Sequence, residues 1–131
     1  EKPEIRKNYF ATYNKIDIAL DTFPFSGGAT SIEALWMGVP FITLNGDSLV
    51  SRQGVSILQN VELQEWIANN EESYINNAVL LSSNIEQLKK IRKGLRDQLL
   101  SSPLFDATLF SQNFTDALFG MWKESIKKMV D

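Results

Sequence analysis

The residues best suited to chemistry in this sequence lie between positions 21 and 40, which read DTFPFSGGATSIEALWMGVP. A glycine pair, Gly27–Gly28, is followed there by the hydroxyl side chains of Thr30 and Ser31. Glycine has no Cβ and lets a bulky group approach the backbone. Where such a loop opens a helix, the first N–H groups lack intrahelical partners and carry partial positive charge, so they can bind an anion. The pattern predicts a cradle for a phosphate or a diphosphate.

A purely structural interpretation of the same residues stays open. The sequence contains neither the G-x-G-x-x-G pattern of dinucleotide sites nor the G-x-x-x-x-G-K-[ST] pattern of P-loops. Thr30 and Glu33 also have the spacing of a capping box, in which Thr30 is the N-cap and Glu33 reaches back to its N–H. In that case Gly27–Gly28 is a turn and the loop binds nothing.

The surrounding residues predict a βαβ unit that positions this loop. Residues 16–20 (IDIAL) and 41–44 (FITL) are short runs with β-branched side chains, typical of buried strands. Between them, apolar residues at helical spacing predict a helix over residues 30–38 that ends at Gly38. A strand–helix–strand unit of about 30 residues implies parallel strands and a right-handed crossover. Ligands bind beyond the carboxyl ends of such strands, where the glycine loop lies.

The remainder of the chain predicts helices. Ser83 and Glu86 have capping-box spacing and predict the start of a helix that runs to about residue 100. Asp106 is expected to cap a long last helix, with its apolar residues on the inner side. Further helices are expected at residues 5–13, 52–60, 63–68 and 71–81.

The expected fold class is α/β, with short parallel strands and several packed helices, in a single domain that spans residues 1–131. A sheet of two strands rarely stands alone, so we expect this domain to be incomplete. Part of the sheet is then expected upstream of Glu1, or the chain pairs with a second copy of itself. The core is expected to include the three tryptophans, which fall on apolar helical faces: Trp36, Trp66 and Trp122.

The composition excludes several classes of site. The 131 residues carry a formal net charge of −3 and contain neither cysteine nor histidine. This excludes disulfides, thiol nucleophiles, the usual zinc sites and triads with an imidazole base. The acidic balance argues against a nucleic-acid partner. No apolar run approaches the ~20 residues of a membrane span, and the first residues do not resemble a signal peptide. No membrane partner is expected, and a cytoplasmic location is the default.

Three further features leave alternatives. Asp17 and Asp21 share a strand face and could form a metal pair, although Asp21 is better explained as a cap of the loop, so no metal is expected. Arg52 could face the diphosphate, or it could pair with Asp47 in the preceding turn. A basic helix face could bind an acidic partner, although solvation explains it better. That face carries Lys89, Lys90, Arg92, Lys93 and Arg96.

Residues 19–47, ALDTFPFSGGATSIEALWMGVPFITLNGD, resemble the C-terminal catalytic lobe of the O-GlcNAc transferase and SPINDLY group, glycosyltransferase family 41. Two later stretches agree with it, SRQGVSIL at residues 51–58 and SSPLFDATLF at residues 101–110, with Trp122 beyond them. The resemblance covers nearly the whole chain, from Tyr9 to Trp122. The bacterial SPINDLY-like branch, whose loop reads F-P-Y-N-G-G-T-T-T, is more similar to this sequence than the animal branch is.

The resemblance implies a Rossmann-like C-terminal lobe of a two-lobed GT-B enzyme that binds a nucleotide sugar, usually UDP-GlcNAc. The sugar passes to a Ser or Thr hydroxyl of an acceptor protein with inversion, without a metal and without a cofactor other than the donor. The family's lysine near the diphosphate and the acceptor-side groups are expected upstream of Glu1, in the other lobe, and a TPR-type helical-repeat region beyond it. No catalytic residue is expected in this chain, which alone is expected to be inactive.

The resemblance also assigns roles to residues of this sequence. Ala29 and Thr30 are expected at the diphosphate, through backbone N–H and hydroxyl. Glu33 is expected to accept hydrogen bonds from ribose hydroxyls. Tyr9 falls where the family commonly has a histidine, and its ring could stack on the base. The expected nucleotide-sugar-binding residues are Tyr9, Gly27, Gly28, Ala29, Thr30, Ser31 and Glu33, with Arg52 as a further candidate.

Two departures from the pattern of the branch keep other functions open. Ser26 is shorter than the family's asparagine, and Ala29 lacks the hydroxyl of the family's threonine. A lost hydrogen bond to a charged group costs about 1.5–3 kcal/mol, or roughly ten- to hundredfold in affinity. The alternatives are a degenerate, non-catalytic lobe that acts as an interaction module, or a transferase for another sugar, from GDP-fucose or UDP-glucose.

Overall fold

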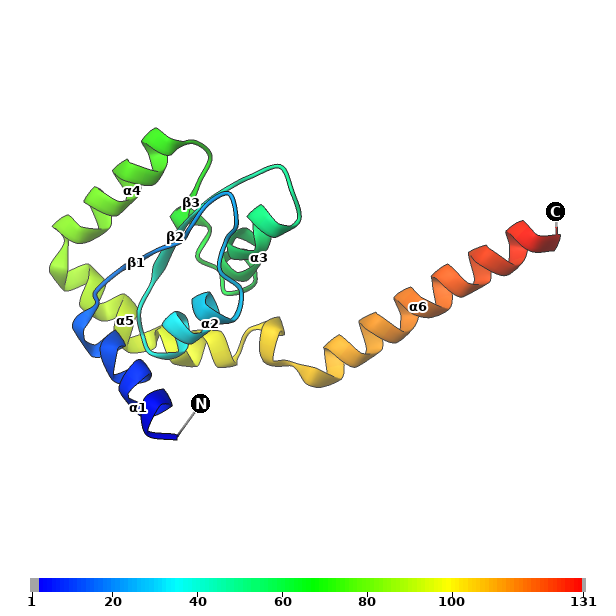
Figure 1. Cartoon of the computed structure of the whole chain (residues 1–131), viewed down its shortest axis with the longest axis horizontal. Coiled ribbons are helices and arrows are strands. Elements are labelled where there is room, and N and C mark those ends of the chain that lie inside the picture. The colour runs from blue at the N-terminus through cyan, green and yellow to red at the C-terminus, as the bar shows by residue number, and fades with distance from the viewer. Residues whose placement is uncertain (1–2, 131) are drawn as a thin grey trace.

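The computed structural model describes residues 3–130 and has an α/β structure. Figure 1 shows a short sheet surrounded by helices, with the last helix projecting away from them. The helices are α1 (Pro3–Thr12), α2 (Ala29–Trp36), α3 (Gln53–Asn60), α4 (Glu71–Ser83), α5 (Ile85–Leu100) and α6 (Ala107–Val130). The strands are β1 (Ala19–Leu20), β2 (Phe41–Leu44) and β3 (Ile67–Ala68).

The strands form a parallel sheet in the order β1-β2-β3. Ala19 lies opposite Phe41, and Thr43 lies opposite Ile67. The central strand β2 is covered on both faces, since the adjacent residues Phe41 and Ile42, which point to opposite faces, are 1% and 0% exposed. Coverage of both faces is typical of parallel sheets. The predicted fold class, α/β with short parallel strands and packed helices, is confirmed.

Two strand predictions differ from the structure. The first strand covers two residues instead of 16–20, because the chain before it closes a 3₁₀ turn, in which the Ile16 N–H donates to the Tyr13 carbonyl at 3.3 Å. Residues 63–68, predicted as a short helix, form a 3₁₀ turn (Gln64–Trp66) followed by β3. The third strand forms because β2 provides a ladder partner, and no local pattern in these residues could show that partner.

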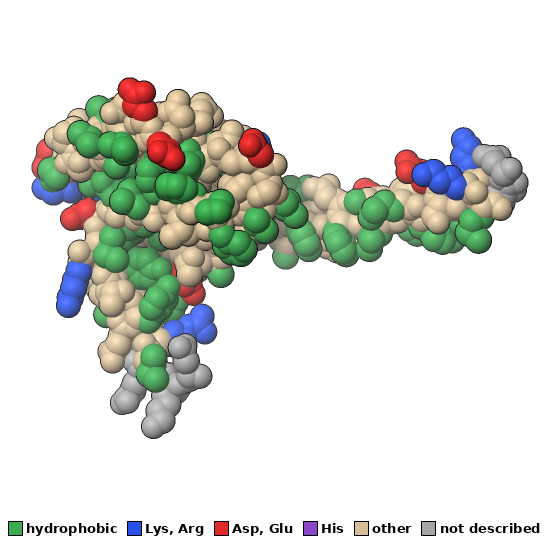
Figure 2. Space-filling view, turned by 45° about the horizontal axis from the view of Figure 1, so that its top comes forward, with side chains coloured by type: hydrophobic (Ala, Val, Ile, Leu, Met, Phe, Trp, Pro, Cys, Tyr) green, Lys and Arg blue, Asp and Glu red, His purple; other side chains and the backbone are tan. Residues whose placement is uncertain are grey.

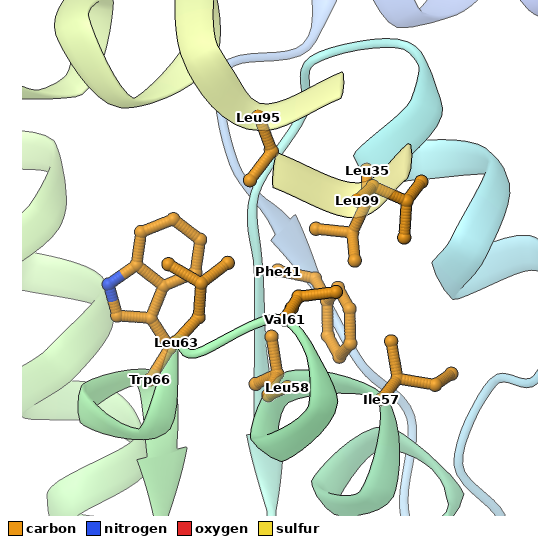
Figure 3. Close-up of a cluster of buried hydrophobic side chains, with 9 residues drawn as sticks. All are labelled: Leu35, Phe41, Ile57, Leu58, Val61, Leu63, Trp66, Leu95 and Leu99. Carbon is orange, nitrogen blue, oxygen red and sulfur yellow. The ribbon is translucent and has the colours of Figure 1, made fainter. Parts of the chain in front are cut away.

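The main core lies between the sheet and the helices α2, α3 and α5 (Figure 3). Trp66 is 2% exposed, so its predicted place in the core is confirmed. Full burial of a large apolar side chain contributes about 1.5–3 kcal/mol to folding. The side chains of this cluster are Leu35, Phe41, Ile57, Leu58, Val61, Leu63, Trp66, Leu95 and Leu99.

Two of the three predicted helix-end residues act as expected. Gly38 ends α2 with φ +75°, a conformation that glycine adopts without strain. Asp106 caps α6 by accepting a hydrogen bond from a backbone N–H of its first turn at 2.9 Å. The predicted start at Ser83 is wrong, because Ser83 is the last residue of α4. Asn84 caps α5 instead and accepts a hydrogen bond from the Gln87 N–H at 3.1 Å.

The apolar side of α6 is exposed, and its predicted inner position is wrong. Phe110 is 66% and Trp122 is 56% exposed, and Figure 2 shows apolar side chains along this helix. The prediction for Trp36 is also wrong, because its ring is partly exposed and stacks on Phe105. A helical period specifies an apolar face but not the surface that covers it. Among residues 3–130, no helix combines the length and the hydropathy of a membrane span.

Candidate functional site

The glycine loop connects the carboxyl end of β1 to the start of α2, as predicted. Gly28 is the N-cap of α2, and no side chain caps it. The Ser31 N–H donates to the Gly28 carbonyl at 3.1 Å. The N–H groups of Gly28, Ala29 and Thr30 have no acceptor among residues 3–130. Three successive free donors at a helix start are the arrangement that suits an anion.

Glu33 does not reach back to the helix start, so the capping-box interpretation is wrong. Its Oε2 accepts a hydrogen bond from the Tyr9 hydroxyl of α1 at 3.0 Å. The Tyr9 hydroxyl also lies 2.9 Å from the Tyr13 hydroxyl. The Tyr13 hydrogen bond, then burial and the Glu33 hydrogen bond, raise the pKa of Tyr9 above its usual range. Tyr9 is therefore protonated at neutral pH and orients the Glu33 carboxylate.

Asp21 caps the glycine loop. This was one of two predictions for it, the other being a metal pair with Asp17. It follows β1 directly and is 8% exposed. Its Oδ1 accepts a hydrogen bond from the Gly27 N–H at 2.7 Å, and its Oδ2 accepts one from the Thr43 hydroxyl at 2.7 Å. The carboxylate thus connects the loop to the central strand.

Ser26 is a structural residue of the loop. It is 1% exposed, and its hydroxyl donates to the Val50 carbonyl at 2.9 Å. The same hydroxyl accepts a hydrogen bond from the Gly54 N–H at 3.2 Å. These contacts tie the loop to the chain that leads into α3. The serine that replaces the family's asparagine at this position therefore uses its hydroxyl for contacts within the chain.

A small hollow of about 180 Å³ lies beside the start of α2, and its polar lining residues include Asp21, Gly27, Thr30 and Ser31. Ser31 is 7% exposed and lines this hollow. A Cβ at position 27 would lie 2.4 Å from the Ser31 Oγ and 2.9 Å from the Thr30 Oγ1. Both hydroxyls therefore converge on the Gly27 backbone, and they can do so because residue 27 is glycine.

A larger hollow of about 630 Å³ lies on the other side of the helix start, where Gly28 and Ala29 line it together with Arg52 of the chain before α3. The Arg52 guanidinium donates to the Asn45 Oδ1 at 2.8 Å and to the next carbonyl at 3.3 Å. The predicted pairing with Asp47 is therefore wrong. Arg52 stabilises the turn after β2 at the edge of this hollow.

The two aspartates of the suggested metal pair have separate partners. Asp17 forms an ion pair with Arg92 at 3.2 Å, whereas Asp21 binds the loop. Among the described residues 3–130, no three His, Cys, Asp or Glu side chains lie close enough to hold a metal together.

The basic face of α5 makes contacts within the chain. Lys89 pairs with Glu86 at 2.8 Å. Arg92 binds Asp17, and the Arg96 Nε donates to the Trp36 carbonyl at 2.6 Å. These contacts agree with a solvated face that also holds neighbouring segments.

Tyr74 of α4 belongs to the site, although the sequence pattern did not indicate it. Its hydroxyl donates to the Asp21 carbonyl at 2.7 Å, and its ring lies edge-on to Phe23 of the loop, 5.8 Å between centroids. Burial, and then the charge of Asp21, raises the pKa of Tyr74, so it remains a donor at neutral pH. Tyr74 and Asp21 are 53 positions apart, and no local signal connects them.

The structure thus groups the predicted site residues around one helix start. Tyr9 and Glu33 contact each other, Gly27, Thr30 and Ser31 line the small hollow, and Gly28, Ala29 and Arg52 line the large one. Their binding of a nucleotide sugar stays a prediction.

Residues 6–114 match the family model described as "Glycosyl transferase family 41". The chain belongs to glycosyltransferase family 41. This family 41 chain is 37% identical over 91% of its length to the SPINDLY protein of Petunia hybrida, and 38% identical over 92% to that of Arabidopsis thaliana. Both are described as a "probable UDP-N-acetylglucosamine–peptide N-acetylglucosaminyltransferase". The chain spans 13% of the length of each.

A solved structure of the same group has the same fold. The chain of an O-GlcNAc transferase mutant of Thermobaculum terrenum matches with a TM-score of 0.83 and 40% identity, over 92% of the family 41 chain and 23% of its own length. The UDP-N-acetylglucosamine–peptide N-acetylglucosaminyltransferase of Caenorhabditis elegans is 33% identical over 82% of the chain, which covers 9% of its length. The predicted resemblance to the O-GlcNAc transferase and SPINDLY group is confirmed.

Proposed function

We propose that this chain is the donor-binding part of a protein O-glycosyltransferase, and that its donor is a nucleotide sugar, UDP-GlcNAc. The observation that carries the proposal is the uncapped start of α2, beyond the carboxyl end of β1, in a family 41 chain. The relatives' names support the donor, since they include UDP-N-acetylglucosamine and a peptide acceptor.

The proposed diphosphate lies at the start of α2. Free N–H groups of Gly28, Ala29 and Thr30 provide hydrogen-bond donors, and the positive end of the helix dipole favours the anion. The Thr30 and Ser31 hydroxyls, which converge on the Gly27 backbone, provide two more. Ala29 contributes through its backbone N–H, which does not depend on the side-chain hydroxyl that alanine lacks. The positive end of α2 offsets part of the diphosphate's negative charge, and the rest is assigned to groups of the full-length enzyme outside this chain. The proposed transfer uses no metal ion.

The proposed ribose contact is Glu33. Its Oε2 is occupied by the Tyr9 hydroxyl, which leaves Oε1 for the ribose hydroxyls. Tyr9 is 40% exposed as a residue, and we propose that its ring provides an aromatic surface on which the base stacks. Tyr9 of α1 and Glu33 of α2 lie next to each other and are joined by this hydrogen bond.

In the proposed reaction the sugar passes with inversion to a Ser or Thr hydroxyl of an acceptor protein. Binding and orientation of the donor are the contribution of residues in this chain. The groups that act on the acceptor are assigned to the remainder of the full-length enzyme. We therefore expect no transfer by the 131-residue chain on its own, and sugar transfer by that chain to an acceptor peptide would contradict this assignment.

Calorimetric titration of the full-length protein tests the donor. UDP is expected to bind, and to bind more tightly than GDP. Tighter binding of GDP would replace UDP-GlcNAc with a GDP-sugar such as GDP-fucose. If neither nucleotide binds, the lobe is a non-catalytic interaction module, and the proposed function is wrong. Transfer from UDP-GlcNAc and UDP-glucose, compared side by side, separates the two UDP-sugars.

A further inference from the structure

We propose that Asp21 is the positioning residue of the phosphate loop, and that it aims the free N–H groups of α2 by fixing the Gly27 N–H. This inference rests on the proposed function, because it concerns the same helix start. The hydrogen bonds of the Asp21 carboxylate go to Gly27 and Thr43, and not to the free N–H groups of residues 28–30. Asp21 acts through the loop.

Three hydrogen bonds, two from β2 and one from α4, hold Asp21 in place. Its own N–H donates to the Ile42 carbonyl at 2.9 Å, which extends the pairing of β1 with β2 by one residue. Its carbonyl accepts the Tyr74 hydroxyl of α4 at 2.7 Å. Its Oδ2 accepts the Thr43 hydroxyl of β2 at 2.7 Å. The backbone and one carboxylate oxygen are thus anchored to the sheet and to α4, so the other oxygen has a fixed direction.

That other oxygen binds the loop at the point where the loop becomes the ligand cradle. Oδ1 accepts the Gly27 N–H at 2.7 Å, and the next N–H group, that of Gly28, is the first of the three free donors. Adjacent peptide planes are coupled through two dihedral angles, so a fixed N–H at residue 27 restricts the direction of the N–H at residue 28. Ser26 is anchored through Val50 and Gly54. The backbone is therefore fixed at residues 26 and 27, just before the free N–H groups of residues 28–30.

The packing leaves room for the Asp21 carboxylate and for little else. A Cβ at Gly54 would lie 2.4 Å from the Asp21 Oδ2 and 2.4 Å from the Thr43 Oγ1. Asp21 is 8% exposed, and both of its oxygens are paired. A buried carboxylate near a bound diphosphate would repel it, so its presence at this place is explained by the hydrogen bonds that it accepts.

The hydrogen-bond explanation distinguishes two substitutions. In Asp21→Asn, the amide oxygen can accept the Gly27 N–H, and the amide NH₂ can donate to the Thr43 hydroxyl, which also accepts. Asp21→Ala removes both contacts. Asn should therefore preserve the direction of the loop, although it removes the charge, and Ala should not.

The experiment compares the affinities of UDP and uridine for the full-length protein by calorimetry. The dissociation constant of uridine divided by that of UDP measures the contribution of the phosphate contacts, because uridine lacks phosphates. This quotient is the ratio used below, and it falls when the phosphate contacts weaken. Asp21→Ala is expected to lower this ratio about tenfold or more while the affinity for uridine stays within about twofold. Asp21→Asn is expected to keep the ratio within about threefold of the wild type. Asp17→Ala is the matched control and should leave the ratio unchanged, because Asp17 pairs with Arg92 away from the loop.

Three outcomes would overturn the inference. The first is a folded Asp21→Ala protein with the wild-type ratio. The second is an equal loss of UDP and uridine affinity, which indicates a general structural role. The third is an Asp21→Asn protein as impaired as Asp21→Ala, which indicates that the charge is what matters. A wild-type protein that binds UDP and uridine alike would instead overturn the proposed function, and this inference with it.

Thr43→Val provides the test if Asp21→Ala does not fold. Valine has nearly the shape of threonine but cannot donate to Oδ2, so the carboxylate loses one anchor and keeps the Gly27 contact. The ratio is expected to fall about threefold with uridine affinity unchanged. An unchanged ratio in a folded Thr43→Val protein would also overturn the inference.

Discussion

The body of the molecule (residues 13–105) and its arm (α6, Ala107–Val130) contain similar proportions of apolar residues. The body buries many of these side chains, whereas the arm exposes them. In the body the side chains of the main cluster are 6% exposed or less. On the arm, Phe110, Phe114 and Trp122 are each more than half exposed. The same kind of periodic pattern thus has two outcomes, and the presence or absence of a neighbouring surface decides between them.

The largest expected difference between the two regions is at their tryptophans. Trp66→Ala in the body should lower the free energy of unfolding of the 131-residue chain by about 3–5 kcal/mol, because it leaves a cavity in the core. Trp122→Ala on the arm should change it by less than about 0.5 kcal/mol, since no cavity forms. Chemical denaturation measures both. Equal losses at the two positions would contradict the distinction between body and arm.

The next effect concerns ligand affinity. Thr30→Val removes the hydroxyl at similar size and should weaken UDP binding to the full-length protein about tenfold to hundredfold. The matched change on the arm, Thr115→Val, should leave UDP binding unchanged. Calorimetry with both variants provides the comparison. If Thr30→Val binds UDP as the wild type does, the role proposed for this side chain is wrong.

A smaller effect is expected at Glu33. Glu33→Gln should weaken UDP binding about fivefold, because hydrogen bonds from ribose to a neutral amide are weaker than those to a carboxylate. The melting temperature should not change, since Glu33 does not cap α2. Glu124→Gln on the arm is the matched control. A lower melting temperature with unchanged UDP affinity would show that Glu33 is a structural residue.

The smallest expected effect is on stability at high pH. Tyr74→Phe removes the hydrogen bond to the Asp21 carbonyl and should cost about 1 kcal/mol at pH 7. Because the folded state raises the pKa of Tyr74 above the ordinary 10.0, the wild type binds this proton more strongly when folded. Its free energy of unfolding should therefore fall as the pH rises from about 10 through the raised pKa.

Denaturation curves at pH 7 and at pH 11 measure this loss. Tyr74→Phe lacks the ionisable hydroxyl and should lose less stability between the two pH values than the wild type does. Equal losses would show that Tyr74 does not titrate differently in the folded and unfolded states.

Sequence patterns predicted the elements whose determinants are local. The strand at residues 41–44, the end of α2 at Gly38 and the loop before α2 follow from β-branched runs, helical spacing and glycine. The candidate residues from Gly27 to Ser31 were predicted for the same reason. Glycine and the start of a helix can be recognised from neighbours in sequence, although distant residues hold the loop in place.

Other features depend on partners that are far apart in the sequence. Strand β3 needs β2 to form its ladder. Glu33 has a capping spacing, yet Tyr9, 24 positions away, takes its carboxylate. For Glu33, the sequence spacing predicts a partner at the start of its own helix. In the folded chain a distant residue binds its carboxylate instead.

By itself, the sequence determined the family, the α/β class and the place of the loop, because residue order and local periodicity carry that information. The tertiary structure decided how the loop is held. Asp21 meets Thr43 and Tyr74 only when β1, β2 and α4 have come together. It also decided that α2 starts uncapped and that the arm exposes its apolar side, since both depend on which groups come within contact distance after the chain has folded.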